Sequence, residues 1–218
     1  MLATSWHEMA KSQRIIVGLF VLYAAVQVAT LLQITHYYPN GFKTENYFSP
    51  LGAYLAANGW AGIVSFIDGT IPDIFGYGPT FRPPLFSVTL AGIYALLGER
   101  EIYGLILNNV FLTLTLLVIH LMGRRVSPSV GLIAPFLMML DPIFLAEANS
   151  NQSDTMFMFF VVLSAYLLVV STAERPSFPL LALGSIALVI AIFTRHAGLY
   201  IPVFIAAGLV GVYGVRKN

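Results

Sequence analysis

The sequence has 218 residues, of which 58% are hydrophobic and 10% are charged, and its mean hydropathy is +0.81. Soluble domains carry about 25% charged residues, so this composition excludes a soluble globular domain and indicates an integral, multi-pass membrane protein. The chain has no cysteine, which excludes disulfides and thiolate metal sites, and its net charge of +1 leaves no basic field that would attract nucleic acid.

The first predicted element is an uncleaved membrane span. Lys11 and Arg14 precede an apolar stretch, residues 15–32, that is longer than a signal-peptide core and lacks a clear cleavage site. We therefore expect residues 15–34 to cross the plasma (inner) membrane and the N-terminus to stay in the cytoplasm.

A long polar loop follows, over about residues 35–102, and it is rich in carboxylates, aromatic residues, glycine and proline. The pattern of residues 45–58 predicts a short amphipathic helix that lies in the membrane interface. The Gly- and Pro-rich residues 69–84 predict an irregular loop, which we expect to form the substrate entrance. The aromatic residues expected at headgroup depth are Tyr47, Phe48, Tyr54 and Trp60.

The remaining apolar stretches predict one transmembrane domain over residues 1–218, all-α and polytopic, with about six spans. Residues 83–98 are ambiguous, because about 16 residues are few for a span. They either cross the membrane or lie on its outer side as an interfacial or re-entrant helix. The predicted spans are residues 15–34, 103–122, 129–148, 154–172, 178–194 and 197–215.

The distribution of basic residues favours one of these two arrangements. If residues 83–98 cross, four basic residues lie on the N-terminal side and seven on the other. If they stay outside, seven basic residues lie on the cytoplasmic side and four outside, as the positive-inside rule prefers. The second arrangement also gathers most of the acidic residues at the outer face: Glu45, Asp68, Asp73, Glu99, Glu101, Glu147 and Asp154.

Two polar patches therefore meet at the predicted outer face, the long loop and an island at residues 147–154. Carboxylates that converge from distant segments suggest a shared pocket, although outer loops are also polar without any function. Asp141 precedes Pro142 within a predicted span, where it is either a functional intramembrane acid or a helix cap. Asn108 and Asn109 are expected to hydrogen-bond between helices.

The order and spacing of several short motifs carry a resemblance to a known family. Arg82-Pro-Pro-Leu-Phe opens an apolar helix that closes in Leu-Leu-Gly98, and later spans end in Leu-Met-Gly-Arg-Arg125 and Leu-Asp-Pro142. Ser-Asp154 opens the next apolar helix, and Phe-Thr-Arg195-His-Ala-Gly follows. Over about residues 10–215 the chain resembles the N-terminal module of the GT-C membrane glycosyltransferases, which include protein mannosyltransferases, aminoarabinose transferases and oligosaccharyltransferase catalytic subunits.

This resemblance implies transfer of a sugar from a polyprenyl-phosphate-linked donor to a lipid, glycan or protein acceptor at the extracytoplasmic face. In that family an acid at the start of the first outer loop is the general base or orients the acceptor. Here Thr44 stands at the usual Asp position, so Glu45, Asp68 or Asp73 must substitute, or the protein is inactive. Asp154 or Glu147 matches the second acid of the family.

The candidate catalytic residues are thus Glu45, Asp154 and Asp73, and the candidate substrate-binding residues are Arg82, Glu147, Arg195 and His196. Cationic groups stabilise a departing phosphate, and arginine can bind its oxygens in a bidentate way. The arginines could instead snorkel to lipid headgroups, and Asp154 could merely cap a helix. No cofactor is predicted with certainty; a divalent cation held by Glu147, Asp154 and His196 is an option, although their spacing is not diagnostic.

A second function class stays open, a non-catalytic polyprenyl-phosphate or lipid binder, or a transporter subunit, within a membrane complex. Thr44 favours it, and so does the end of the sequence after about six spans, where relatives continue. We expect the chain to need a further membrane subunit or a C-terminal half. The sequence has no convincing internal repeat, which makes a secondary transporter a weaker hypothesis.

Overall fold

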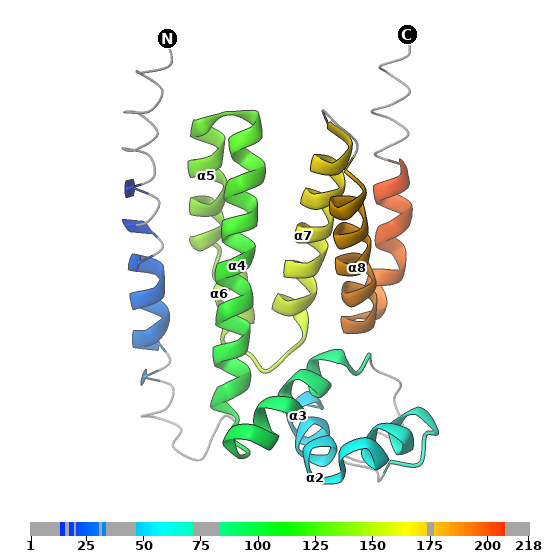
Figure 1. The fold of residues 1–218 in the computed structure, drawn as a ribbon. Helices are drawn as coiled ribbons and strands as arrows, with labels where there is room; N and C mark the ends of the chain where they lie inside the picture. Colours follow the sequence, from blue (N-terminus) through cyan, green and yellow to red (C-terminus); the bar gives the residue numbers. More distant parts are fainter. Residues whose placement is uncertain are drawn as a thin grey trace.

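The computed structural model describes residues 14–15, 18–19, 21–30, 32–33, 47–71, 83–173 and 177–207, and every regular element in these ranges is a helix. The predicted all-α class is therefore confirmed. Two groups of helices are apparent: an upright bundle, and a pair of helices that lies across one end of it (Figure 1).

The bundle contains α4 (Ile102–Val126), α5 (Pro128–Met139), α7 (Asp154–Ala173) and α8 (Phe178–Thr194). Leu112 and Leu116 of α4 are fully buried and pack with Phe144 and with Tyr23 from the helix Val21–Thr30. At the C-terminal end of α4 the chain turns sharply. Ser127 has an extended backbone there, and its side chain accepts a hydrogen bond from the Val130 amide, 3.1 Å away. This is an N-cap followed by proline at the first position of the helix.

Glycine lets α4 and α5 touch directly at that turn. A Cβ atom on Gly123 would lie 2.8 Å from the Gly131 Cα atom, closer than any side chain can be accommodated without a shift. His120 is buried beside this contact, and its Nδ1 lies 2.7 Å from the Gly131 carbonyl oxygen. Direct backbone contact and the His120 side chain therefore both hold α4 and α5 together at this turn.

Two helices are long and apolar enough to cross a membrane within the described residues, Ile102–Val126 and Asp154–Ser171. A third candidate span results if the bent pair of helices α5 and α6 (Pro142–Ala148) is counted as one span. The described residues therefore contain two or three candidate spans, fewer than the six predicted. The predicted span 129–148 is bent by 68°. Pro142 cannot continue the α5 hydrogen bonds, and exposed Asp141 accepts from the Ile143 amide at 2.9 Å, so Asp141 caps α6 and is not turned into the bundle.

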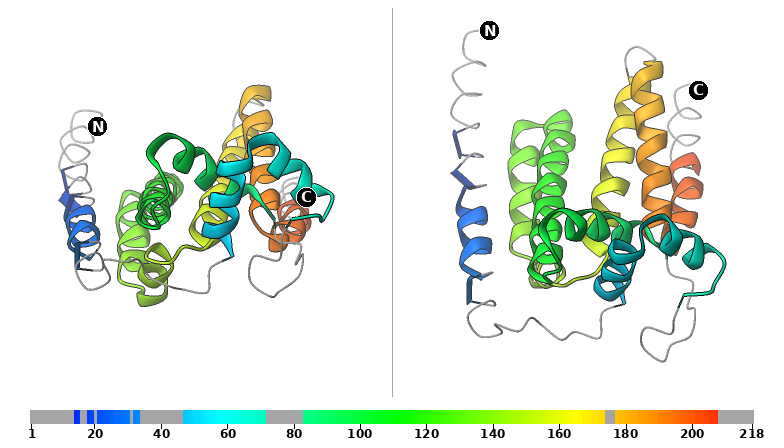
Figure 2. Two further views of the ribbon diagram at one scale, coloured as in Figure 1. Left: turned by 90° about the horizontal axis from the view of Figure 1, so that it is seen from below. Right: turned by 60° about the horizontal axis from the view of Figure 1, so that its bottom comes forward.

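The two helices that lie across the end of the bundle are α2 (Phe48–Ile67) and α3 (Leu85–Leu97), and they lie at the end where α4 begins (Figures 1 and 2). Phe86 and Leu90 of α3 are fully buried against Phe48, and Gly52 lets the two helices approach. At 13 residues, α3 is about 20 Å long, which is too short to cross about 30 Å of hydrocarbon.

The helix predicted over residues 45–58 continues to Ile67 but changes direction at Gly59, whose φ of 54° is in the left-handed region. Such a backbone conformation favours glycine. Phe48 is buried in the α2–α3 core, so it does not share the exposed position of Trp60, which is 76% accessible.

Candidate functional site

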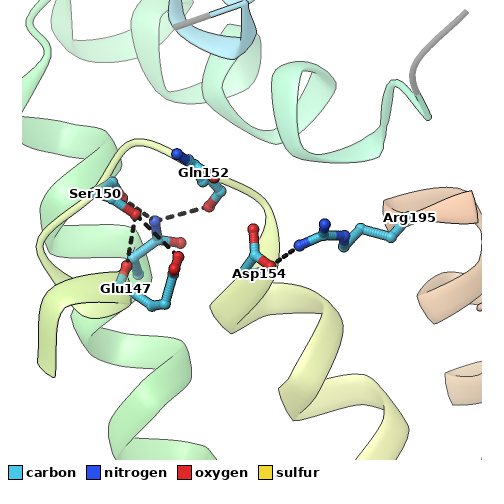
Figure 3. Close-up of polar contacts among 6 residues, drawn as sticks. Glu147, Ser150, Gln152, Asp154 and Arg195 are labelled. Carbon is cyan, nitrogen blue, oxygen red and sulfur yellow. Dashed lines mark hydrogen bonds and ion pairs between the residues drawn. The ribbon is translucent and has the colours of Figure 1, made fainter. Parts of the chain in front are cut away.

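The polar island predicted at residues 147–154 covers the end of α6, the connection 149–153 and the first residue of α7 (Figure 3). Asn108 of α4 is fully buried, and its Nδ2 donates to the carbonyl oxygens of Ser150 at 2.5 Å and Gln152 at 2.9 Å. The next residue, Asn109, donates to the Ala148 carbonyl at 3.1 Å. The predicted hydrogen bond between helices is therefore confirmed for Asn109, whereas Asn108 binds the α6–α7 connection and not a helix.

A further amide ties this connection to the start of α4. Asn151 is 4% accessible, and its Nδ2 donates to the Glu101 carbonyl at 3.1 Å. The tripeptide Asn151-Gln-Ser153 matches an N-glycosylation pattern, but a buried and hydrogen-bonded amide is not available to a glycosylating enzyme. The pattern is therefore structural in the folded chain.

Asp154 and Arg195 form an ion pair at the end of the bundle (Figure 3). Asp154 is the first residue of α7, and Arg195 follows α8 in an extended conformation that separates it from the 3-10 helix η1 (His196–Tyr200). The side chains are 32% and 41% accessible, respectively. α7 and α8 pack side by side, which brings together two residues 41 positions apart in the sequence.

The ion pair borders a polar cavity of about 310 Å³. An apolar cavity of about 420 Å³ lies beside it, and Pro83 and His196 line both. The polar cavity is lined by Phe48, Pro83, Gln152, Ser153, Asp154, Thr194, Arg195, His196 and Ala197. The apolar cavity is lined by Leu55, Ile63, Phe66, Ile67, Pro83, Pro84, Val88, Ile192, Phe193, His196 and Leu199.

Three of the predicted site residues thus come together, namely Asp154, Arg195 and His196. Glu147 does not line the cavity; its carboxylate lies 3.4 Å from the Ser150 hydroxyl. Three further candidates, Glu45, Asp73 and Arg82, lie outside the described residues.

Gln152, Ser153 and Thr194 complete the polar side of the cavity, although none of them was predicted as a site residue. Their position next to Asp154 and Arg195 was the available signal. Within the ranges that the structure describes, no three His, Cys, Asp or Glu side chains are close enough to hold a metal ion. The cation set of Glu147, Asp154 and His196 is therefore not assembled here.

A second acidic group lies at the corner between α3 and α4. Burial raises the pKa of Glu101, and the nearby charge of Glu99 raises it further. Burial also raises the pKa of Tyr94, to which the charges of Glu99 and Glu101 add, while a hydrogen bond of 2.8 Å with Ser49 acts in the opposite direction. Neither glutamate lines the polar cavity; of the described carboxylates Asp154 alone does, and Glu45 and Asp73 lie outside the described residues.

The helices are apolar, two of them lie across the end of the bundle, and residues from this pair and from the bundle line the polar cavity. These features define a helical membrane protein with its polar site at one end of the bundle. The family model for dolichyl-phosphate-mannose-protein mannosyltransferase matches residues 81–215, and the chain belongs to this family of GT-C type membrane glycosyltransferases. The matched range contains Asp154, Arg195 and His196, whereas Glu45 and Asp73 precede it. No curated protein and no solved structure matches the chain.

Proposed function

We propose that this chain transfers a sugar from a polyprenyl-phosphate donor to an acceptor at the extracytoplasmic membrane face, alone or as the N-terminal module of a larger enzyme. The ion pair of Asp154 with Arg195 carries the proposal, because it lines a polar cavity that adjoins an apolar one. A polyprenyl phosphate has the same two parts, an anionic head and an apolar tail.

The charge distribution supports an extracytoplasmic site. Arg124 and Arg125 lie in the last turn of α4, at the end of the bundle opposite α2 and α3 (Figure 1). The positive-inside rule assigns that arginine-bearing end to the cytoplasm, and hence the polar cavity to the other side. This orientation and the six predicted spans belong to the proposal.

In the proposed mechanism the donor phosphate binds Arg195, with His196 beside it. Arg195 stabilises the charge that grows on the phosphate as its bond to the anomeric carbon breaks. The acceptor oxygen forms the new bond to that carbon and gives up its proton to a carboxylate. Glu45, Asp73 and Asp154 are the candidates for that base, and pairing with Arg195 favours Asp154 as the group that orients the guanidinium.

The test uses the full chain in proteoliposomes with a set of polyprenyl-phosphate hexoses, mannose first, and measures release of polyprenyl phosphate. We expect release that is lost in Glu45→Gln if Glu45 is the base, with the variant still inserted and folded. Normal turnover in Glu45→Gln transfers that assignment to Asp73 or Asp154.

One observation favours the alternative function of a carrier-lipid binder. Asp154 is the one described carboxylate that lines the cavity, and it is already paired with the Arg195 guanidinium. A binder would take up polyprenyl phosphate but release no sugar from any donor. That result in the same proteoliposomes would overturn the transferase proposal.

A further inference from the structure

The connection between α6 and α7 is held in place by a side chain of a different helix. Asn108 uses its amide nitrogen twice, on the carbonyl oxygens of Ser150 and Gln152. Two residues later the chain reaches Asp154, which pairs with Arg195. The backbone that leads into the polar cavity is therefore fixed from α4.

Packing on the same helix supports this attachment. Gly104, one turn before Asn108, leaves room for the Asn151 side chain, since a Cβ atom there would collide with Asn151 Oδ1. Asn151 in turn reaches back to the Glu101 carbonyl. The connection thus contacts α4 at two successive turns.

The identity of residue 108 fits this role better than a packing role. Asn108 is fully buried, and its Oδ1 atom has no hydrogen-bond partner. Burying an unpaired carbonyl costs free energy, which an apolar side chain of similar size would avoid. What the amide adds is a pair of N–H groups that donate to two backbone carbonyls of the connection.

We propose that Asn108 is a positioning residue for the cavity, which sets Gln152, Ser153 and Asp154 against Arg195. Removing its N–H groups frees the 150–152 backbone, so that Asp154 no longer holds the guanidinium in one place. The effect on catalysis rests on the proposed transferase function, whereas the effect on geometry does not.

The absence of cysteine allows a direct measurement of that geometry. The exposed residues Gln152 and Tyr200 are replaced by cysteine and spin-labelled in the full chain in nanodiscs, and dipolar EPR gives the distance distribution between the connection and η1. Gln152 accepts the hydrogen bond of Asn108 with its backbone carbonyl, so a label on the Gln152 side chain leaves that hydrogen bond in place.

We expect a narrow distribution in the otherwise unchanged chain and a broadened one in Asn108→Leu. If the Asn108→Leu variant does not insert into the membrane, Asn108→Ala is used in its place. The matched control is Thr115→Val, at a fully buried residue of α4 whose hydroxyl donates to Phe111 of its own helix, and it should leave the distribution narrow. Gly104→Ala, which displaces Asn151, should broaden it.

Transfer is measured without labels in the same variants. A misplacement of about 1 Å can lower a rate on the order of a hundredfold, so Asn108→Leu should lose transfer on that scale while Thr115→Val keeps it. An unchanged distance distribution in Asn108→Leu overturns the proposal, and so does a broadened one with normal transfer. If the unaltered chain transfers nothing, the distance measurement alone decides the positioning role, and the failure falls on the proposed function.

Discussion

The two ends of the α4 helix are built in different ways. At its far end α4 meets α5 through Gly123 and Gly131, backbone against backbone, with no room for a side chain between them. At its near end, buried asparagines reach across to carbonyls of the α6–α7 connection. Direct backbone contact leaves no space between α4 and α5. The side-chain contacts at the other end hold the connection at a distance from α4, where it borders a cavity lined by the Asp154–Arg195 ion pair.

The largest effect is expected at the ion pair. Arg195→Gln and Asp154→Asn should each lower transfer on the order of a hundredfold, because one loses the phosphate-binding cation and the other its orienting carboxylate. The double variant should be no worse than Arg195→Gln, since the two residues act as a unit. Arg125→Gln, at the opposite end, is the matched control and should transfer normally; additive losses in the double variant would argue against a shared role.

Substitutions at the Gly123–Gly131 contact should show the opposite behaviour, a loss of stability with little loss of function per folded molecule. Gly131→Ala places a methyl group within 3.2 Å of the Arg124 backbone, and overpacking of this kind costs about 1–3 kcal/mol. Thermal unfolding in detergent measures it. Gly92→Ala in α3 has nothing within 4 Å and should be neutral or slightly stabilising.

A smaller loss is expected in the α2–α3 pair. Tyr94→Phe removes the 2.8 Å hydrogen bond to buried Ser49 and should cost about 1 kcal/mol of stability. Tyr103→Phe is the comparison, because its hydroxyl lies 3.5 Å from the Leu97 carbonyl in an exposed setting. Equal melting temperatures for both variants would contradict a stabilising role for the Ser49 contact.

The smallest effect concerns pH. The pKa of Glu101 is raised in the folded chain above its ordinary value of 4.5, so folding favours the protonated form. Its contribution to stability is fully present below that value and is lost as the pH rises through the folded pKa. Glu101→Gln should remove this decline, which unfolding curves at a series of pH values above 4.5 would reveal; an unaltered pH dependence would speak against it.

These differences also show what local sequence can and cannot predict. Composition and apolar length were sufficient for the all-α class, and the polar residues 147–154 were enough to predict a polar connection near Asp154. The bend after Met139 was missed although Asp141-Pro142 contains both a cap and a helix-breaking residue. The burial of His120 against Gly131 depends on how α5 packs on α4, which no local pattern indicates.

Pairing between distant segments was the harder problem. That Arg195 faces Asp154 follows from the packing of α7 on α8, and no motif records it. The same holds for the carbonyls that Asn108 binds, since the prediction of interhelical hydrogen bonding named no partner. The helix predicted over residues 45–58 is interrupted at Gly59, whose φ of 54° is in the left-handed region, and a second helical stretch follows to Ile67.

The most direct test of the account is the affinity of the full chain in nanodiscs for a polyprenyl phosphate, measured for the unaltered protein, Arg195→Gln and Arg125→Gln. We expect at least about tenfold weaker binding in Arg195→Gln, from the loss of one charge-assisted phosphate contact, and unchanged binding in Arg125→Gln. Equal affinity in all three proteins would contradict a phosphate site at the Asp154–Arg195 pair.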